Sequence, residues 1–234
     1  MKKWGNSMRG YVVKNDRKLK SEKILAILEE HLQTDVSNYE ILDIGTGNGE
    51  IANYIAKKNN IVYSVDVENQ IDLEEEIQQF YFKEVSDEYL PFEDGVFDVV
   101  ISNHVVEHVM DSNLHLKEIY RVLKGGGICY FATPNRNFVR DPHTKTFFIH
   151  WLPYKLFFCV LEKMGRYQEP IKLLWYKNMK SLFNSTGFSY REYTARVINE
   201  PVKFKMDGNV KVKIPRCMQR ISPTNIFVLK KTEE

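Results

Sequence analysis

The segment that most constrains the fold is Ile41–Glu50, which reads ILDIGTGNGE. An apolar run carrying one acid is followed by glycine at positions 45, 47 and 49 and then by a helical pattern of apolar residues. This order predicts a strand, a tight turn and the start of a helix. Glycine lets a ligand lie against the backbone, and the open N–H groups of the following helix face the same place. The segment therefore predicts a nucleotide-type site, and an ordinary left-handed turn is the simpler alternative.

The acids around this segment indicate which ligand it takes. The dinucleotide fingerprint G-x-G-x-x-G needs glycine at position 50, where the chain has Glu50. A carboxylate in the first turn of a helix repels a pyrophosphate, so Asp43 and Glu50 favour a phosphate-free ligand with a cationic centre. Asp66 ends the next apolar run, Ile61–Asp66. An acid at the end of the second strand can accept both hydroxyls of a ribose, and a solvated loop acid is the alternative.

Composition excludes several classes of protein. The 234 residues carry a net charge of +2, so bulk electrostatics do not indicate nucleic-acid binding. No apolar run approaches the roughly 20 residues that span a bilayer, and the first residues lack the apolar core of a signal peptide. The 3 cysteines are widely spaced and form no C-x-x-C pair, which argues against a disulfide framework. We therefore expect a cytoplasmic protein.

Three further segments follow the glycine segment in order: LPFEDGVFDVVISNHVVEHV, HLKEIYRVLKGGG and ATPNRN. With the glycine segment they resemble successive motifs of the class I S-adenosylmethionine-dependent methyltransferases. They are most similar to the small-molecule branch that holds the ubiquinone-biosynthesis O-methyltransferases, over residues 40–138. The resemblance implies S-adenosylmethionine as the cofactor and S-adenosylhomocysteine as the product.

The same resemblance implies a fold. It is an α/β fold, a doubly wound, seven-stranded and mostly parallel sheet of the Rossmann-like methyltransferase type, with the last strand inserted antiparallel. We expect one domain over residues 1–234. Its parts are an N-terminal helical region (1–38), a cofactor-binding half (39–133), an aromatic-rich insertion after strand five (134–176) and C-terminal strands (177–234). The residues themselves give Ser21 as a candidate cap of a helix that runs to about Leu32, and Asp111 as a candidate cap of a helix through Leu123. Apolar runs predict the later strands at Phe80–Val85, Phe97–Asn103, Ile128–Thr133, Phe188–Tyr193 and Asn225–Lys230.

The resemblance also implies a set of site residues. An acid just before LPF would lie near the adenine, which points to Asp87 or, one register earlier, Ser86. The segment after strand four would line the methyl group, which places Asn103 and His104 near the sulfonium. The expected cofactor-binding residues are Asp43, Gly45, Thr46, Gly47, Asn48, Gly49, Asp66, Val67, Ser86, Asp87, Asn103 and His104.

The sequence HVVEH at residues 104–108 has two interpretations. It matches H-x-x-E-H, an inverted zinc-peptidase motif with two histidines on one helical face. These residues directly follow an apolar strand, however, in a place that the methyltransferase resemblance already explains, so we expect no metal. We take His104 and His108 as the candidate catalytic residues, with a hydrogen-bonded structural role as the alternative for His108.

Two later segments bear on the acceptor. The insertion is either a helix packed on the core or a lid that forms an apolar wall over the methyl group. Residues 202–214 alternate around Asp207-Gly208, which predicts a hairpin with a three-residue loop and four lysines on one face. Those lysines either form a solvated edge or hold an anionic part of the acceptor.

We therefore expect a methyltransferase that acts on a small molecule, apolar or anionic, most simply at an oxygen. Two alternatives stay open: a non-catalytic S-adenosylmethionine-binding module, and a nicotinamide-dependent oxidoreductase, which Glu50 opposes.

Overall fold

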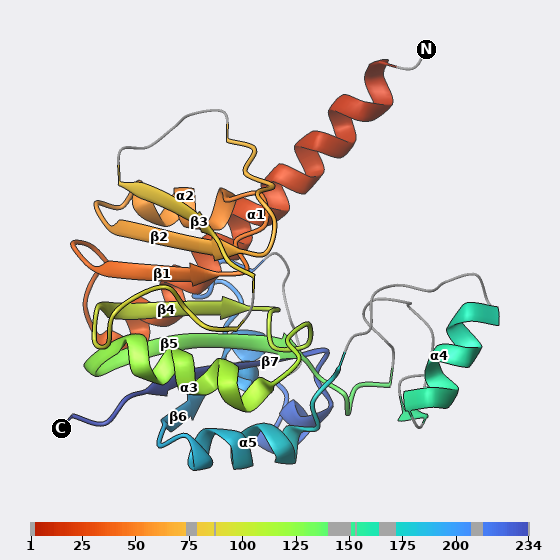
Figure 1. Ribbon diagram of the computed structural model, residues 1–234. Helices are drawn as coiled ribbons and strands as arrows, with labels where there is room; N and C mark the ends of the chain where they lie inside the picture. The colour runs from red at the N-terminus through yellow and green to blue at the C-terminus, as the bar shows by residue number, and fades with distance from the viewer. Residues whose placement is uncertain are drawn as a thin grey trace.

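The computed structural model describes residues 3–73, 79–86, 88–139, 151–152, 154–163, 172–206 and 213–233. Helices cover both faces of a central sheet (Figure 1). The strands are β1 (Glu40–Ile44), β2 (Ile61–Asp66), β3 (Phe80–Glu84), β4 (Phe97–Asn103), β5 (Leu123–Pro134), β6 (Ser189–Glu192) and β7 (Thr224–Lys230). The helices are α1 (Lys3–Leu32), α2 (Glu50–Ala56), α3 (Ser112–Val122), α4 (Tyr154–Lys163), α5 (Tyr176–Ser185), α6 (Thr194–Asn199) and the 3₁₀-helix η2 (Arg216–Ile221).

The sheet has the predicted topology. Its strand order is β3-β2-β1-β4-β5-β7-β6. Strand β1 pairs in parallel with β2 and β4, whereas β7 runs antiparallel between β5 and β6. The chain winds outward from β1 in one direction and from β4 in the other. The carboxyl ends of β1 and β4 therefore flank a topological switch point, where open α/β sheets bind ligands.

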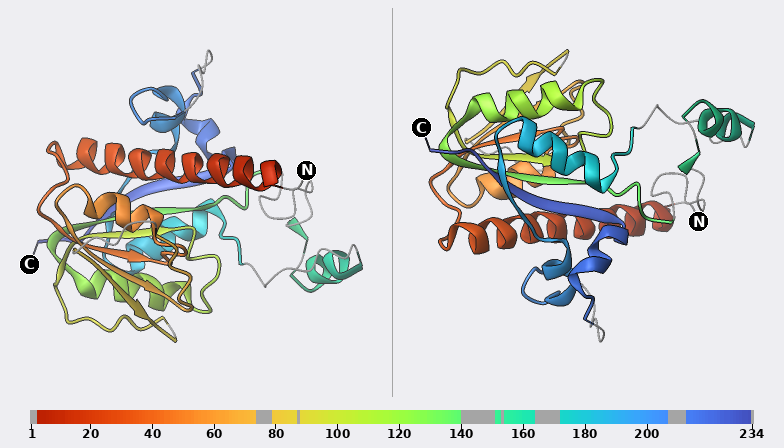
Figure 2. Two further views of the ribbon diagram at one scale, coloured as in Figure 1. Left: turned by 90° about the horizontal axis from the view of Figure 1, so that it is seen from above. Right: turned by 90° about the horizontal axis from the view of Figure 1, so that it is seen from below.

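The two faces of the sheet bury separate cores. Ile41 packs with α1 and α2 on one face, while its neighbour Leu42 packs with α3 and α5 on the other. Figure 2 shows α1 and α3 on opposite sides of the sheet. Because successive side chains of a strand point to opposite faces, central strands covered by helices on both sides are apolar throughout.

The N-terminal helix is longer than the sequence suggested. The apolar stripe predicted a helix capped by Ser21, but α1 already begins at Lys3, and Ser21 Oγ donates to Arg17 O within the helix. That prediction was wrong because serine can bond to a carbonyl one turn earlier instead of capping. The consequence is that Arg17 reaches the glycine loop.

The first half of the predicted hairpin is not a strand. Residues 201–205 form turns, in which Phe204 N donates to Glu200 O and Met206 N donates to Pro201 O. Phe204 is fully buried beside Tyr193, so burial of one ring against α1 and α6 prevails over the alternating pattern. The predicted loop, Asp207-Gly208-Asn209, lies outside the described residues.

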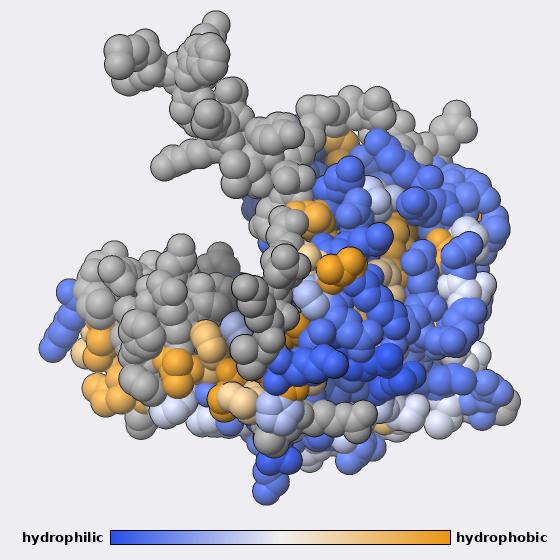
Figure 3. Space-filling model, turned by 180° about the vertical axis from the view of Figure 1, so that it is seen from behind, coloured by the Kyte–Doolittle hydropathy of each residue, from blue (hydrophilic) through white to orange (hydrophobic). Residues whose placement is uncertain are grey.

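The insertion contains one described helix, α4, which stands apart from the sheet in Figures 1 and 2. Hydrophobic side chains gather on the surface around it (Figure 3), and Trp151 and Leu156 are exposed there. Its role as a lid or acceptor wall stays a prediction. Among the described residues, no helix has the length and apolar character needed to cross a bilayer.

Candidate functional site

A cavity of about 680 Å³ opens at the switch point. This volume lies within the usual range of small-molecule sites, about 300–1,000 Å³. Its walls come from the carboxyl ends of β1 and β2 and from the segments that follow β3 and β4. The lining residues are Ile44, Gly45, Val65, Asp66, Val67, Val85, Ser86, Glu88, Leu90, His104, Val105, His108, Val109, Met110 and His115.

The glycine loop has the tight backbone that its sequence predicted. Gly45 has a φ of 71°, and a Cβ built on it would lie 2.6 Å from Val105 Cγ2, a side chain of the facing wall. Gly49 has a φ of 80° and caps α2 without any side-chain hydrogen bond. A side chain at Gly45 would push the cavity wall inward, so glycine keeps the site open.

Two acids stand at the ends of β1 and β2. Asp43 is buried, and its Oδ2 has no hydrogen-bond partner among the described residues. Burial raises the pKa of Asp43 to about 7, the Thr46 hydroxyl lowers it and the charge of Asp66 raises it. Asp66 is only half-buried, and its carboxylate accepts from Gly47 N and from Val67 N, each at 2.7 Å. Each carboxylate oxygen has a second lone pair, so Asp66 can still accept a ligand hydroxyl.

Arg17 of α1 lies over the glycine loop, which the sequence did not reveal. Its Nη1 donates to Asn48 Oδ1, and its Nε lies 3.6 Å from Glu50 Oε2. Glu50 is thus paired with a cation of α1, which offsets part of its charge. The charge argument against a pyrophosphate therefore rests mainly on Asp43, which is buried at the end of β1. No signal in the sequence links position 17 to position 50, because their contact depends on the angle at which α1 crosses α2.

The loop after β3 is held by a network on α3. All three nitrogens of the Arg121 guanidinium are engaged: they donate to both oxygens of Glu118, to Asp94 Oδ1, and to the carbonyls of Phe92 and Leu90. Glu118 Oε2 in turn accepts from Leu90 N at 2.9 Å. This network fixes the loop, and Leu90 with it, as one wall of the cavity.

Within that loop, Glu88 is a cavity residue that sequence reasoning missed. Its Oε1 accepts from Met110 N at 2.7 Å, which joins the loop after β3 to the loop after β4. Ser86 lines the cavity as expected. Asp87, the other predicted adenine contact, lies outside the described residues.

The segment HVVEH forms turns and not a helix. His104 has a φ of 61°, which few residues other than glycine adopt, and its N–H donates to Ala132 O. The two histidines therefore do not share a helical face, as the inverted zinc-peptidase motif requires. Among the described residues, no cluster of histidine, cysteine and acids has a metal-binding arrangement.

A buried carboxylate, that of Glu107, lies next to the His104 ring. Glu107 is 1% exposed, and its Oε1 lies 3.3 Å from His104 Nδ1. Its Oε2 accepts from Thr133 Oγ1 at 3.1 Å. The imidazole of His104 is partly exposed and lines the cavity. Glu107 Oε1 has no hydrogen-bond partner among the described residues, so its contact with His104 is a close approach of a carboxylate to an imidazole nitrogen.

Two other histidines line the cavity. His115 of α3 is buried and its Nε2 lies 3.0 Å from Ser102 Oγ of β4. Burial lowers the pKa of His115 to about 4, against the opposing charges of Glu88 and Glu107. His115 is therefore a neutral, structural side chain of the wall, whereas His108 comes from the loop after β4.

The structure brings together much of the predicted site. Gly45, Asp66, Val67, Ser86, His104 and His108 all line the cavity, and Asp43, Thr46, Gly47, Asn48 and Gly49 form the strand end and loop beside it. Asn103 ends β4 directly before His104, but it is not a lining residue. The unpartnered oxygen of Asp43 and the space kept by Gly45 suit a ligand with a cationic group near the loop and hydroxyls near Asp66.

Sequence comparison places the same region in a known family. A family described as "Methyltransferase domain" matches residues 42–131. Ubiquinone biosynthesis O-methyltransferases of Escherichia coli and Shigella boydii are 31% identical over 105 residues. That match covers 42% of this chain and 44% of each relative, so the chain spans less than half the length of the curated relatives it matches.

Solved structures extend the likeness to most of the chain, at the level of fold. An S-adenosylmethionine-dependent methyltransferase from Mesorhizobium loti has a TM-score of 0.58 at 13% identity and covers 84% of this chain and 92% of its own. Phosphoethanolamine N-methyltransferase 2 of Haemonchus contortus, solved with S-adenosylmethionine, has a TM-score of 0.57 at 18% identity, over 90% of this chain and 52% of its own. The chain therefore has the fold of these methyltransferases over most of its length, and its residues 42–131 match the methyltransferase domain family.

Proposed function

We propose that this protein transfers the methyl group of S-adenosylmethionine to an oxygen of a small-molecule acceptor. The observation that carries the proposal is the cavity at the switch point, with acids at the ends of β1 and β2 and a carboxylate-backed histidine after β4. The cofactor supplies a methyl carbon already activated by its sulfonium. The protein then has two tasks, which are to align the acceptor and to remove its proton.

The cofactor is held by the glycine loop and its two acids. Asp66 accepts the ribose hydroxyls, and the unpartnered oxygen of Asp43 accepts from the ammonium group. Ser86 and Glu88 lie on the adenine side, in the loop that Arg121 fixes. Arg17 of α1 contacts Asn48 and Glu50 and so holds the glycine loop from its outer side.

His104 is the general base for the acceptor hydroxyl. Glu107 lies beside its Nδ1, we assign proton acceptance to Nε2, and the nearby buried carboxylate stabilises the resulting imidazolium. His108, from the same loop, is the second candidate. The name of the matched relatives, O-methyltransferases, supports oxygen as the acceptor atom.

Cofactor binding is tested by calorimetry with S-adenosylmethionine and with NADH. Asp66→Ala should weaken S-adenosylmethionine binding by about 2 kcal/mol, as expected for the loss of charge-assisted hydrogen bonds to two hydroxyls. Asp35→Ala, at an exposed loop acid before β1, is the matched control and should leave affinity unchanged. An unchanged dissociation constant for Asp66→Ala, or tighter binding of NADH than of S-adenosylmethionine, would overturn the cofactor assignment.

The base is tested separately, by turnover on a panel of phenols and hydroxy acids. His104→Gln should lower kcat by about 100-fold or more while leaving cofactor affinity intact. Glu107→Gln should lower kcat by a smaller factor, because a neutral amide stabilises the developing imidazolium less than a carboxylate does. If His108→Gln abolishes turnover and His104→Gln does not, the roles of the two histidines are reversed.

A further inference from the structure

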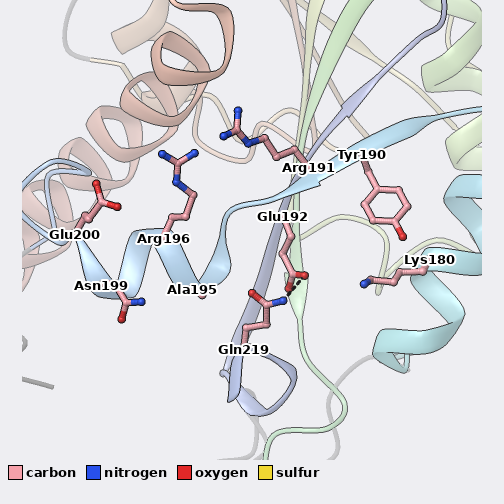
Figure 4. Close-up of a pocket in the computed structure, with 9 residues that line it drawn as sticks. All are labelled: Lys180, Tyr190, Arg191, Glu192, Ala195, Arg196, Asn199, Glu200 and Gln219. Carbon is pink, nitrogen blue, oxygen red and sulfur yellow. Dashed lines mark hydrogen bonds between the residues drawn. The ribbon is translucent and has the colours of Figure 1, made fainter. Parts of the chain in front are cut away.

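A second cavity, of about 700 Å³, lies at the β6 edge of the sheet and shares no lining residue with the first. It forms where α5, β6, α6 and η2 meet (Figure 4). Strand β6 pairs only with β7 and is an edge of the sheet. The lining residues are Lys180, Tyr190, Arg191, Glu192, Ala195, Arg196, Asn199, Glu200 and Gln219.

The cavity wraps around this edge, so its two sides differ in chemistry. Successive residues of a strand point to opposite faces. Arg191 therefore projects from β6 on the side opposite to Tyr190 and Glu192, and Figure 4 shows it with Arg196 on the side that faces α1. Glu192 and Gln219 meet on the other side.

The side that faces α1 has more positive charge than its acids neutralise. The guanidinium carbons of Arg191 and Arg196 lie 5.7 and 5.5 Å from the centre of the Tyr193 ring. Arg196 pairs with Glu30, which it shares with Lys203, and its Nη1 is buried without a hydrogen-bond partner among the described residues. Arg191 forms no ion pair with any described carboxylate. Two guanidinium groups that are incompletely paired favour an anion between them.

The positive charge on this side of the cavity also acts on a nearby histidine. The pKa of His31, on α1, is lowered first by burial and then by the positive charges of Arg191 and Lys230, while Glu30 raises it. His31 Nδ1 lies 3.3 Å from the hydroxyl of Tyr193, the ring that both arginines flank. A bound anion would offset this field, so His31 offers a reporter of occupancy that is independent of catalysis.

On the other side of the cavity, one oxygen of Glu192 has no hydrogen-bond donor among the described residues. Glu192 Oε2 accepts from Tyr176 Oη and from Gln219 Nε2, each at 2.6 Å. Glu192 Oε1 is buried and has no partner among the described residues. Lys180 Nζ lies 4.5 Å from the centre of the Tyr176 ring and makes no ion pair with a described residue. A ligand hydroxyl would satisfy Oε1, and the Tyr190 ring offers an apolar surface beside it.

We propose that this cavity binds a small hydroxylated anion, such as a sugar phosphate or a sugar acid. The anionic group lies between Arg191 and Arg196, and a hydroxyl donates to Glu192 Oε1. The site is separate from the cofactor cavity, so its occupancy does not depend on methyl transfer.

Calorimetry at low ionic strength with four probes tests this proposal on the full chain, without cofactor or acceptor. Glucose 6-phosphate and glucuronate carry both an anion and hydroxyls, inorganic phosphate carries only the anion, and glucose carries only hydroxyls. We expect saturable binding of one or both of the first two, and at least tenfold weaker binding of inorganic phosphate and glucose. Which of the two binds more tightly distinguishes a phosphate from a carboxylate ligand.

Arg191→Gln should weaken binding of the preferred probe by about tenfold, as expected for the loss of one charge-assisted contact. Lys177→Gln, one turn before Lys180 on the exposed side of α5, is the matched control and should change nothing. By NMR, the preferred probe should raise the pKa of His31 in the wild-type protein. Absence of saturable binding by all four probes, or equal affinities of the Arg191→Gln and wild-type proteins, would overturn the proposal, whatever the result of the cofactor experiment.

Discussion

The cofactor end and the C-terminal end of the sheet are built in different ways. At the cofactor end, the groups that line the cavity end strands β1 and β2 or come from the loops after β1 to β4, apart from His115 of α3. Most of them are therefore placed by the backbone of a contiguous segment. At the C-terminal end, the second cavity combines side chains of α5, β6, α6 and η2, and Glu30 of α1 pairs with one of its two arginines. The family match covers residues 42–131 and therefore only the first end.

This difference explains why the site residues at the cofactor end can be predicted from a sequence motif, whereas those at the C-terminal end cannot. A glycine loop or a strand-end acid has its role wherever the strand-turn-helix unit forms, because the unit itself orients the group. An arginine on an edge strand has no role until helices from distant parts of the chain pack beside it. Three predictions, from the largest expected effect to the smallest, test this contrast.

The first concerns Phe204 and Val202, which the predicted hairpin places on one face. In the structure Phe204 is 0% exposed and Val202 is 76% exposed. Phe204→Ala should therefore cost about 4 kcal/mol of unfolding free energy through lost burial and a cavity, whereas Val202→Ala should cost less than about 0.5 kcal/mol. Urea denaturation measures both. Equal losses of stability would support the predicted hairpin. They would contradict the conclusion that tertiary packing determines the structure of residues 201–205.

The second concerns pH and the cofactor end, where two buried groups have opposite effects. The pKa of His115 is about 4 in the folded protein and about 6.5 unfolded. Between these pH values the folded state binds fewer protons than the unfolded state. The free energy of unfolding therefore falls as pH falls from 6.5 to 4. The pKa of Asp43 is about 7 folded and about 3.9 unfolded, so its contribution is lost as pH rises from 4 to 7.

A variant that lacks one of the two groups should show the pH dependence of stability that the other group causes. Asp43→Asn should make stability rise by about 3 kcal/mol between pH 4 and pH 6.5, relative to wild type, and His115→Gln should make it fall by a similar amount. Chemical denaturation at several pH values gives these slopes. The slopes, and not the stability at one pH, are the readout, because either substitution also changes packing. Parallel pH profiles for wild type and both variants would show that neither group is buried as described.

The third concerns Gly45, with Gly95 as its matched control. Both have positive φ, 71° and 68°, but a Cβ at Gly45 overlaps Val105 whereas one at Gly95 meets nothing within 4 Å. Each change to alanine should cost about 1 kcal/mol of stability from backbone strain. Gly45→Ala should also weaken S-adenosylmethionine binding by about tenfold, because Val105 must move into the cavity. Equal cofactor affinity in the two variants would mean that the loop does not set the width of the site.

Much of the fold was open to prediction because its signals are local. Asp111 caps α3 as expected, with its side chain accepting from Asn113 N and Leu114 N. The seven strands lie where apolar runs predicted them, within a few residues, and the antiparallel β7 follows from the family resemblance. The error at Phe204 falls where a local pattern competes with burial against a distant ring, that of Tyr193. The error at Ser21 has a local cause, since its hydroxyl bonds to a carbonyl one turn earlier in α1.

The sequence by itself determined the strand-loop-helix unit at residues 41–56, the acid that ends β2 and the histidine that follows β4, because backbone geometry fixes the direction of each. Only the tertiary structure decided that Arg17 covers Glu50, that Glu107 stands behind His104 and that Arg191 faces Arg196 at a free edge. These contacts depend on crossing angles and on turns at strand ends. Such features arise from the packing of whole elements, which no short stretch of sequence encodes.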